Sequence, residues 1–183
     1  EDRHCLAAYQ LASQMAFARL GLETLNLLGL DAPVQNDRAT DDKLDGIPEW
    51  FIGPLMSGLV CHEVGHTLGL RHNFKASSLY TMAEINSEDV RGKKPFTASV
   101  MDYNPVNFNM DSGDVQGDFA MIGIGPYDTW AIEYGYTSGD LKEVLAKSNL
   151  PEHAYLTDED TGGPDPLAKR YDFSKDPLDY AEN

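Results

Sequence analysis

The sequence predicts a mainly helical domain with long irregular loops. Apolar residues recur at intervals of three and four in several segments, which is typical of amphipathic helices. Residues 31–46 and 92–117 have no such periodicity, and no segment alternates apolar and polar residues clearly enough to predict a strand. The chain has 183 residues, of which 42% are hydrophobic, so it can bury a core of its own. We therefore expect a single domain over residues 1–183.

The first expected element is a long helix over residues 4–29. Its apolar positions have helical spacing, no proline interrupts them, and Gly29 suits a C-terminal cap. Residues 31–53 are acidic and aperiodic, so we expect an exposed loop there. A second helix is expected over residues 54–69, because Pro54 is well tolerated at a first helical position and Gly69 can end a helix.

Shorter helices are expected in the second half of the chain. Thr81 and Glu84 have capping-box spacing, which predicts a helix near residues 81–86. Gly125 and Pro126 favour a helix over residues 125–135, and Asp140 favours one over residues 140–149. The tail over residues 151–183 is expected to be rich in loops.

Charge excludes some classes of partner. Fourteen lysine and arginine residues against thirty aspartate and glutamate residues give a formal net charge of -16. Such a chain repels a phosphate backbone, so we expect no nucleic-acid partner.

No apolar stretch approaches the roughly 20 residues of a membrane-spanning helix. Cys5 and Cys61 are too few for a disulfide framework, and the sequence leaves open whether they pair.

The ends of the chain indicate a portion of a longer protein. Glu1 is not an initiator methionine, and no charged region followed by an apolar region opens the sequence. The last residues form a polar stretch without a tail signal. We therefore favour a portion of a longer protein, with a mature enzyme released by proteolysis as the alternative for the start of the chain.

The run H-E-V-G-H-T-L-G-L-R-H at residues 62–72 carries the chemistry. Residues four apart share a helix face, so His62 and His66 can direct two imidazoles at one zinc ion. Gly69 permits a positive φ that turns the chain, so that His72 can supply the third ligand. The fourth zinc position is then left to water, and Glu63 is placed to accept its proton and deliver it to a leaving amine. The expected reaction is amide hydrolysis.

Each of these residues also has an ordinary structural interpretation, since helical histidines usually pack or face solvent. The five fixed positions together would arise by chance in such a sequence with a probability on the order of 10⁻⁵. We therefore favour a catalytic zinc site. His4 and His153 lack partners at ligand spacing and receive no role.

The extended motif resembles that of the metzincins, zinc endopeptidases in which three histidines bind the metal above a methionine-containing turn. The run Ser99-Val100-Met101-Asp102-Tyr103 is similar to that turn in the astacin and serralysin branches. The resemblance implies that Met101 packs beneath the imidazoles without binding zinc. It also implies that Tyr103 approaches the metal or stabilises the oxyanion, although a buried aromatic with a satisfied hydroxyl remains an equal alternative.

Further runs resemble a bacterial family of large zinc-dependent metalloproteases related to the enzymatic subunit of a cholera-like toxin. They are R-H-N-F-K-A-S-S, S-V-M-D-Y-N-P-V-N and G-P-Y-D-T-W-A-I-E-Y-G-Y, and the resemblance covers about residues 55–180. It implies a secreted, periplasmic or surface-anchored protein. In the last run Asp128 would lie in the first turn of a helix, where a carboxylate satisfies free amides, so we expect a structural role for it.

Other features depart from the metzincin pattern. A metzincin carries a substrate-binding sheet before its zinc helix, and residues 31–53 are too few and too polar to form one. We therefore expect that sheet to lie upstream of Glu1, to be replaced by another element, or to be absent from this protein. Cys61 precedes His62 on the helix and is interpreted as a small buried apolar residue. The acidic residues 157–165 are interpreted as solvated surface, with calcium binding as the less favoured alternative.

The sequence thus predicts a zinc endopeptidase that cuts protein or peptide substrates with a zinc-bound water activated by Glu63. Two alternatives stay open. One is a zinc-containing module that binds a protein partner and has lost catalysis, and the other is a zinc hydrolase of a nonprotein amide. The first would lack a base or fill the open zinc position, whereas Glu63 is present and no fourth ligand lies at short spacing.

Overall fold

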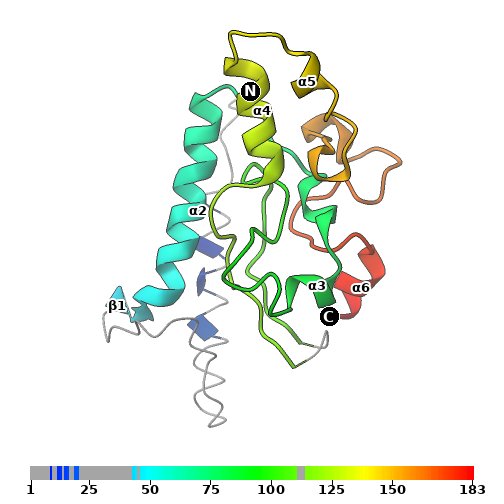
Figure 1. Cartoon of the computed structure of the whole chain (residues 1–183). Helices are drawn as coiled ribbons and strands as arrows, with labels where there is room; N and C mark the ends of the chain where they lie inside the picture. Colours follow the sequence, from blue (N-terminus) through cyan, green and yellow to red (C-terminus); the bar gives the residue numbers. More distant parts are fainter. Residues whose placement is uncertain are drawn as a thin grey trace.

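A computed structural model of the chain describes residues 43–44, 46–110 and 114–183, together with residues 9, 12, 13, 15, 16, 19 and 20. The described part is mainly helical with long loops, as expected, and its one sheet is a short hairpin (Figure 1). The described residues between 9 and 20 are helical, but most of the expected helix at 4–29 lies outside the described residues. Residues 31–42 of the expected loop also lie outside them.

A hairpin and a long helix occupy residues for which a loop was predicted. Strand β1 (Lys43–Leu44) pairs antiparallel with β2 (Ile47–Pro48), and Leu44 faces Ile47 in the register. Helix α2 (Glu49–Thr67) follows directly. The prediction of a loop through residue 53 was therefore wrong at its C-terminal end.

Helix α2 begins earlier than predicted because its first turns bury aromatic surface. Phe51 is buried, and its ring lies 5.4 Å from that of Phe119 and 5.8 Å from that of Trp50. Pro54 consequently lies inside the helix rather than at its start, where it removes one backbone hydrogen bond. The packing of the aromatic rings outweighs the cost of a proline inside the helix. At its C-terminal end the helix stops before Gly69.

The remaining helices follow the prediction with shifted ends. Helix α3 (Met82–Ile85) has the expected capping box between Thr81 and Glu84. Helix α4 spans Pro126–Tyr136, close to the expected range. Helix α5 (Lys142–Leu145) is shorter than predicted, since the amides of Lys147 and Ser148 bond three residues back, in tight turns.

The tail contains more helix than predicted. Two 3₁₀ helices, η2 (Pro151–His153) and η3 (Asp158–Asp160), precede helix α6 (Pro177–Glu182), while η1 (Ala76–Leu79) lies earlier in the chain. The Asp176 side chain accepts a hydrogen bond from the amide of Leu178, and Pro177 occupies the first turn of α6. A capping residue followed by proline is a helix-start signal, and the prediction of a loop-rich tail overlooked it.

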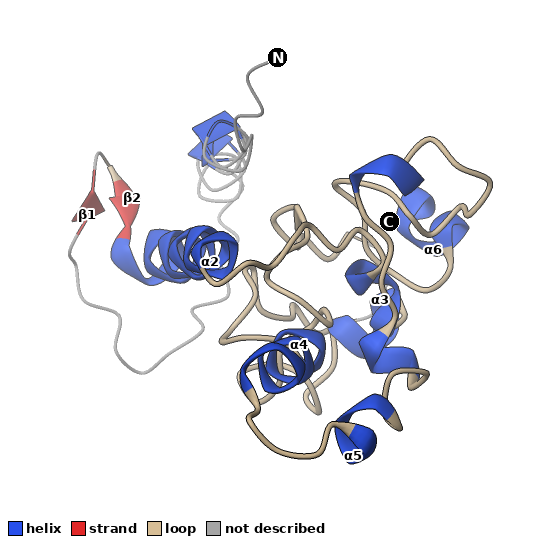
Figure 2. Cartoon of the chain, turned by 90° about the horizontal axis from the view of Figure 1, so that it is seen from above, coloured by secondary structure: helices blue, strands red, loops and turns tan. Residues whose placement is uncertain are grey.

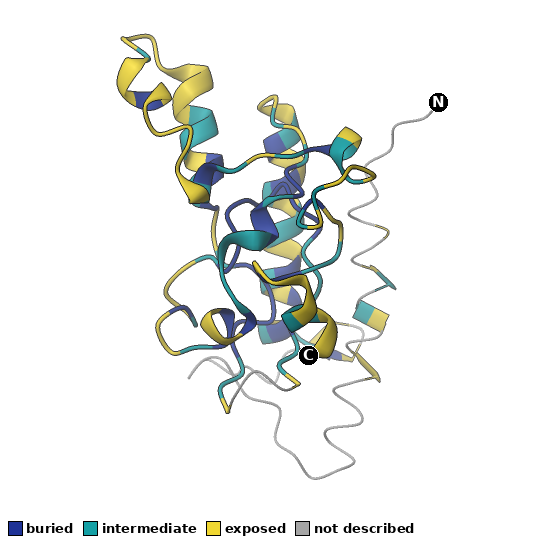
Figure 3. Ribbon diagram, turned by 90° about the vertical axis from the view of Figure 1, so that its right-hand side faces the viewer, coloured by how far each residue is buried: buried dark blue, intermediate teal, exposed yellow. Residues whose placement is uncertain are grey.

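The loops between the helices supply much of the core. Figure 2 shows loop segments filling the space between α2, α4 and the pair α3 and α6, and Figure 3 shows buried residues concentrated along them. One cluster joins α3 to the turn around Met101: Met82, Ile85, Val90, Phe96, Val100, Met101, Met121 and Phe173. The buried loops thus position the turn around Met101, which is part of the site described below.

Among the described residues no helix is both long and apolar enough to span a membrane.

Candidate metal centre

Three histidines converge at the C-terminal part of α2. His62 and His66 lie one helical turn apart with ring centroids 4.7 Å apart, and the ring of His72 lies 5.3 Å from the first and 4.8 Å from the second. One ligand atom from each residue lies within 4.8 Å of the other two. His62 is buried and the other two are partly buried. The three residues that the motif selected are therefore brought together.

Gly69 turns the chain back toward the helix, as predicted. Its φ is +88°, a conformation that residues with a side chain rarely adopt. Its amide bonds the carbonyl of His66, and the amide of Leu70 bonds the carbonyl of Gly65, each at 3.0 Å. Three residues after Gly69, His72 faces the helix.

The Nδ1 atom of every ring is paired with an oxygen. His62 contacts the carbonyl of Val100 at 2.7 Å, and His66 contacts the carbonyl of Leu70 at 3.0 Å. His72 contacts the carboxylate of Asp158 at 2.9 Å. An oxygen acceptor selects the tautomer of a neutral imidazole with the hydrogen on Nδ1, so the lone pair of each ring is on Nε2.

Burial keeps two of these rings neutral at pH 7. Burial, together with the neighbouring rings of His66 and His72, lowers the pKa of His62 to about 4, although the hydrogen bond to the carbonyl of Val100 opposes the shift. Burial also lowers the pKa of His72, although Asp158 opposes the shift. Neutral imidazole is the form that binds a metal ion.

The donor set fits zinc. Imidazole nitrogen is a preferred zinc ligand, and nitrogens around tetrahedral zinc at about 2.1 Å lie about 3.4 Å apart. The ligand atoms of the three histidines lie within 4.8 Å of one another, and small side-chain rotations would bring them to that spacing. The oxygen partners on Nδ1 match the hydrogen bonds that usually orient histidine ligands.

The turn at residues 99–103 lies directly against this site. Met101 is fully buried, and its amide bonds the hydroxyl of Ser99. Its sulfur lies so close to Gly65 of α2 that a Cβ atom there would overlap with it. Met101 therefore packs against α2 next to His66, while its expected position beneath the imidazoles stays a prediction. The close approach at Gly65 was not identified from the sequence.

Asp128 has the structural role expected from its position in the first turn of α4. Its carboxylate accepts hydrogen bonds from the amides of Gly125 and Val100, each at 2.8 Å, and from the hydroxyl of Ser99. One side chain therefore caps α4 and fixes the turn that carries Met101. Burial raises its pKa, while these hydrogen bonds oppose the shift.

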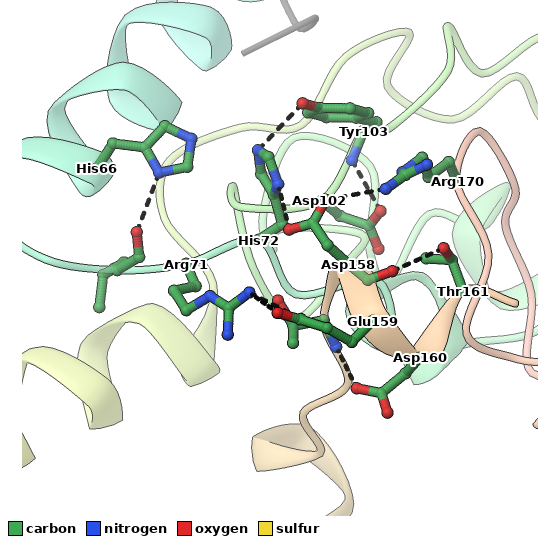
Figure 4. A network of polar contacts seen from close by, with 12 residues as sticks. His66, Arg71, His72, Asp102, Tyr103, Asp158, Glu159, Asp160, Thr161 and Arg170 are labelled. Atoms are coloured by element: carbon green, nitrogen blue, oxygen red, sulfur yellow. Dashed lines mark hydrogen bonds and ion pairs between the residues drawn. The ribbon is translucent and has the colours of Figure 1, made fainter. Parts of the chain in front are cut away.

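Tyr103 lies beside the third histidine. Its ring centroid is 4.8 Å from that of His72, and its hydroxyl lies 3.1 Å from the Nε2 atom of His72 (Figure 4). The ring of Tyr171 stacks on Tyr103 at 5.6 Å, and the ring of Phe74 packs against it at 5.2 Å. The hydroxyl therefore points toward the side of His72 that would face a metal ion.

Glu63 follows His62 on α2 and has an exposed side chain. Its charge opposes the lowering of the His62 pKa. Within the part of the chain that the structure describes, no hydrogen bond or ion pair holds the Glu63 carboxylate. The group is thus accessible from solvent next to a candidate ligand.

Several residues of the site were not identified from the sequence. Asp158 belongs to the acidic stretch that was interpreted as solvated surface, yet it pairs with His72, and its neighbour Glu159 pairs with Arg71. No spacing rule connects residues 72 and 158, so only the fold reveals this contact. Cys61 is partly buried against the core and forms no disulfide with the described residues. Its possible partner Cys5 lies outside the described residues.

Comparison with known proteins gives a family. A family model described as Met-zincin matches residues 45–183, which include α2, the histidines and the turn at Met101. Neither the curated proteins nor the solved structures contain a match. The closer resemblance to a toxin-related bacterial family stays a prediction. By the extent of the match, this chain belongs to the Met-zincin family of zinc metalloproteases, in the metzincin clan.

Proposed function

We propose that the protein is a zinc endopeptidase that hydrolyses internal peptide bonds of a protein or peptide substrate. The observation that carries the proposal is the convergence of His62, His66 and His72, each with its Nδ1 atom bonded to an oxygen. These three residues would hold the ion through Nε2. An extracytoplasmic location is proposed from the family resemblance alone.

Zinc in such a site supplies an acidified water and polarises the substrate carbonyl. Glu63 accepts a proton from the attacking water as the new carbon–oxygen bond forms. It then donates that proton to the amine nitrogen as the carbon–nitrogen bond breaks. Its exposure beside His62 leaves room for a substrate, and its position one residue after a ligand keeps it near the reacting atoms.

Tyr103 is proposed to stabilise the negative charge that develops on the carbonyl oxygen. Its hydroxyl lies beside the Nε2 atom of His72, and its ring is held by Tyr171 and Phe74. A hydroxyl held in place before the reaction stabilises charge without reorganising, which is the requirement for an oxyanion donor. Tyr103 is buried and its hydroxyl contacts Nε2 of His72, as the structural alternative also requires, so the oxyanion role rests on the family resemblance.

The test is the Glu63→Gln variant of the intact protein. We expect kcat for peptide hydrolysis to fall by about 10²- to 10⁴-fold, the usual contribution of a general acid–base group. Zinc content should be unchanged because the substitution keeps all three histidines. Glu49→Gln, an exposed carboxylate in the first turn of the same helix, is the control and should keep full activity. Chelator-sensitive peptidase activity of Glu63→Gln at the wild-type level would contradict the proposal.

A further inference from the structure

The segment around η3 packs against the loop that carries His72. The amide of Phe74 donates to the carbonyl of Leu156 at 2.8 Å, and the amide of Tyr171 donates to the carbonyl of Tyr103 at 3.2 Å. These two bonds join chain regions that are 82 residues (156 minus 74) and 68 residues (171 minus 103) apart in sequence, beside the third histidine. The segment from Leu156 to Tyr171 therefore lies beside His72, where its side chains can contact the ring.

Asp158 uses both of its carboxylate oxygens in this contact. Oδ2 lies 2.9 Å from Nδ1 of His72, and Oδ1 accepts a hydrogen bond from Nη2 of Arg170 at 2.9 Å (Figure 4). The His72 side chain is 13% exposed and that of Asp158 is 38% exposed. The pair is therefore sheltered on the histidine side and open to water on the other.

Arg170 fixes the position of the Asp158 carboxylate by a hydrogen bond to Oδ1, the oxygen that does not contact His72. Its guanidinium carbon lies 4.8 Å from the centre of the Phe74 ring, and that ring lies 5.2 Å from the ring of His72. A planar guanidinium that stacks on an aromatic ring and bonds a carboxylate has few alternative orientations. The position of Asp158 is thus tied to the same aromatic ring that packs against His72.

His72 needs such support more than the other two histidines. His62 and His66 lie on α2, and their Nδ1 partners are backbone carbonyls with fixed positions. His72 follows the helix, in a loop, and its Nδ1 partner is a charged side chain. A carboxylate forms the stronger hydrogen bond and also makes the ring a better electron donor at Nε2.

We propose that Asp158, held by Arg170, is a positioning residue that fixes the tautomer and the ring orientation of His72 as the third metal ligand. The inference rests on the proposed function, since it requires His72 to bind zinc. It assigns a role to the acidic segment that the sequence alone did not connect with the site.

The test measures zinc binding to the full chain by competition with a chromogenic chelator. We expect Asp158→Ala to weaken zinc affinity by about 10- to 100-fold, the usual cost of losing a hydrogen-bond partner of a ligand. Asp158→Asn should weaken it less, because its one oxygen can still accept from His72. Arg170→Gln should weaken it as well, since the carboxylate then loses its second partner.

Glu159→Gln is the matched control. It removes one negative charge from the adjacent residue, which pairs with Arg71 at an exposed position and does not contact the ring. Zinc affinity of this variant should equal that of the wild type. An equal loss of affinity in Glu159→Gln and Asp158→Asn would overturn the inference, because net charge would then explain both.

Visible absorption of the cobalt-substituted chain gives a second readout. A change in ring orientation alters the ligand field, so the bands of Asp158→Asn should differ from those of the wild type and of Glu159→Gln. Zinc affinity and cobalt bands of Asp158→Asn identical to those of the wild type would overturn this inference and leave the proposed function intact. A wild-type chain that binds no zinc would overturn the proposed function itself.

Discussion

At the residue scale, the site depends on small contacts that fix ring orientation. The spacing of His62 and His66 on a helix and the glycine before His72 were sufficient to predict that three candidate metal ligands come together. The acceptors at Val100, Leu70 and Asp158 could not be predicted, because two are backbone carbonyls and the third lies far away in sequence. Residue types reveal which groups can bind zinc, whereas tertiary contacts decide which nitrogen each ring presents.

Gly65 gives a sharp prediction at this scale. A methyl group at this position would overlap with the sulfur of Met101, so Gly65→Ala should destabilise the fold by about 1–3 kcal/mol. The measurement is urea unfolding followed by circular dichroism. Gly58 lies in the same helix with open space around its Cβ position, so Gly58→Ala should instead stabilise by about 1 kcal/mol. Equal effects of the two substitutions would contradict the proposed packing of Met101.

At the element scale, the sequence predicted which helices exist better than where they end. The Thr81 and Glu84 capping box and the Gly125-Pro126 start led to correct helices, because these signals act within one turn. The start of α2 was missed since it depends on Phe119, a residue distant in sequence that packs on Phe51. Local signals fail where tertiary packing outweighs them, as Pro54 inside α2 shows.

Asp128 connects two elements and so carries an element-scale prediction. Asp128→Ala leaves the amides of Val100 and Gly125 and the hydroxyl of Ser99 without their acceptor. Since each unsatisfied buried group costs about 1–3 kcal/mol, we expect a loss of roughly 3 kcal/mol or more in the free energy of unfolding. Asp128→Asn keeps one acceptor and should lose less. The urea midpoint measures both, and an unfolding free energy of Asp128→Ala equal to that of the wild type would refute the connecting role.

At the scale of the whole molecule, this acidic chain buries carboxyl groups, two of which lie close together in the core. Ser77 joins two of them, with its amide on Asp102 at 3.0 Å and its hydroxyl on Asp172 at 3.0 Å. Burial raises the pKa of Asp172 from 3.8 to about 6, and it raises that of Asp102 well above its ordinary value, with the charge of Asp172 adding to the shift. The fold therefore tolerates these groups better in the protonated form.

The free energy of unfolding should fall as the pH rises toward about 6. A carboxyl whose pKa is raised by folding contributes stability that is fully present below its unfolded pKa near 3.8. That contribution is lost as the pH rises through about 6, by at most about 3 kcal/mol for Asp172. Asp172→Asn should remove this part of the pH dependence and gain stability relative to the wild type above pH 6. Urea midpoints between pH 4 and pH 7 measure the difference.

Asp140→Asn is the control for this experiment, since Asp140 is an exposed residue just before α5. It should leave the slope of stability against pH as in the wild type. If Asp172→Asn and the wild type show parallel profiles, the buried carboxyl pair does not contribute to the pH dependence of the fold.

The central claim is that His62, His66 and His72 bind one zinc ion, and zinc stoichiometry by mass spectrometry tests it most directly. We expect near one zinc per chain in the wild type and in Glu63→Ala, and a loss of zinc in His72→Ala. A chelator should remove the ion from the first two, because the site lies at the end of α2 with His66 and His72 only partly buried. A folded wild-type protein without zinc, or zinc retained fully in His72→Ala, would contradict the three-histidine site.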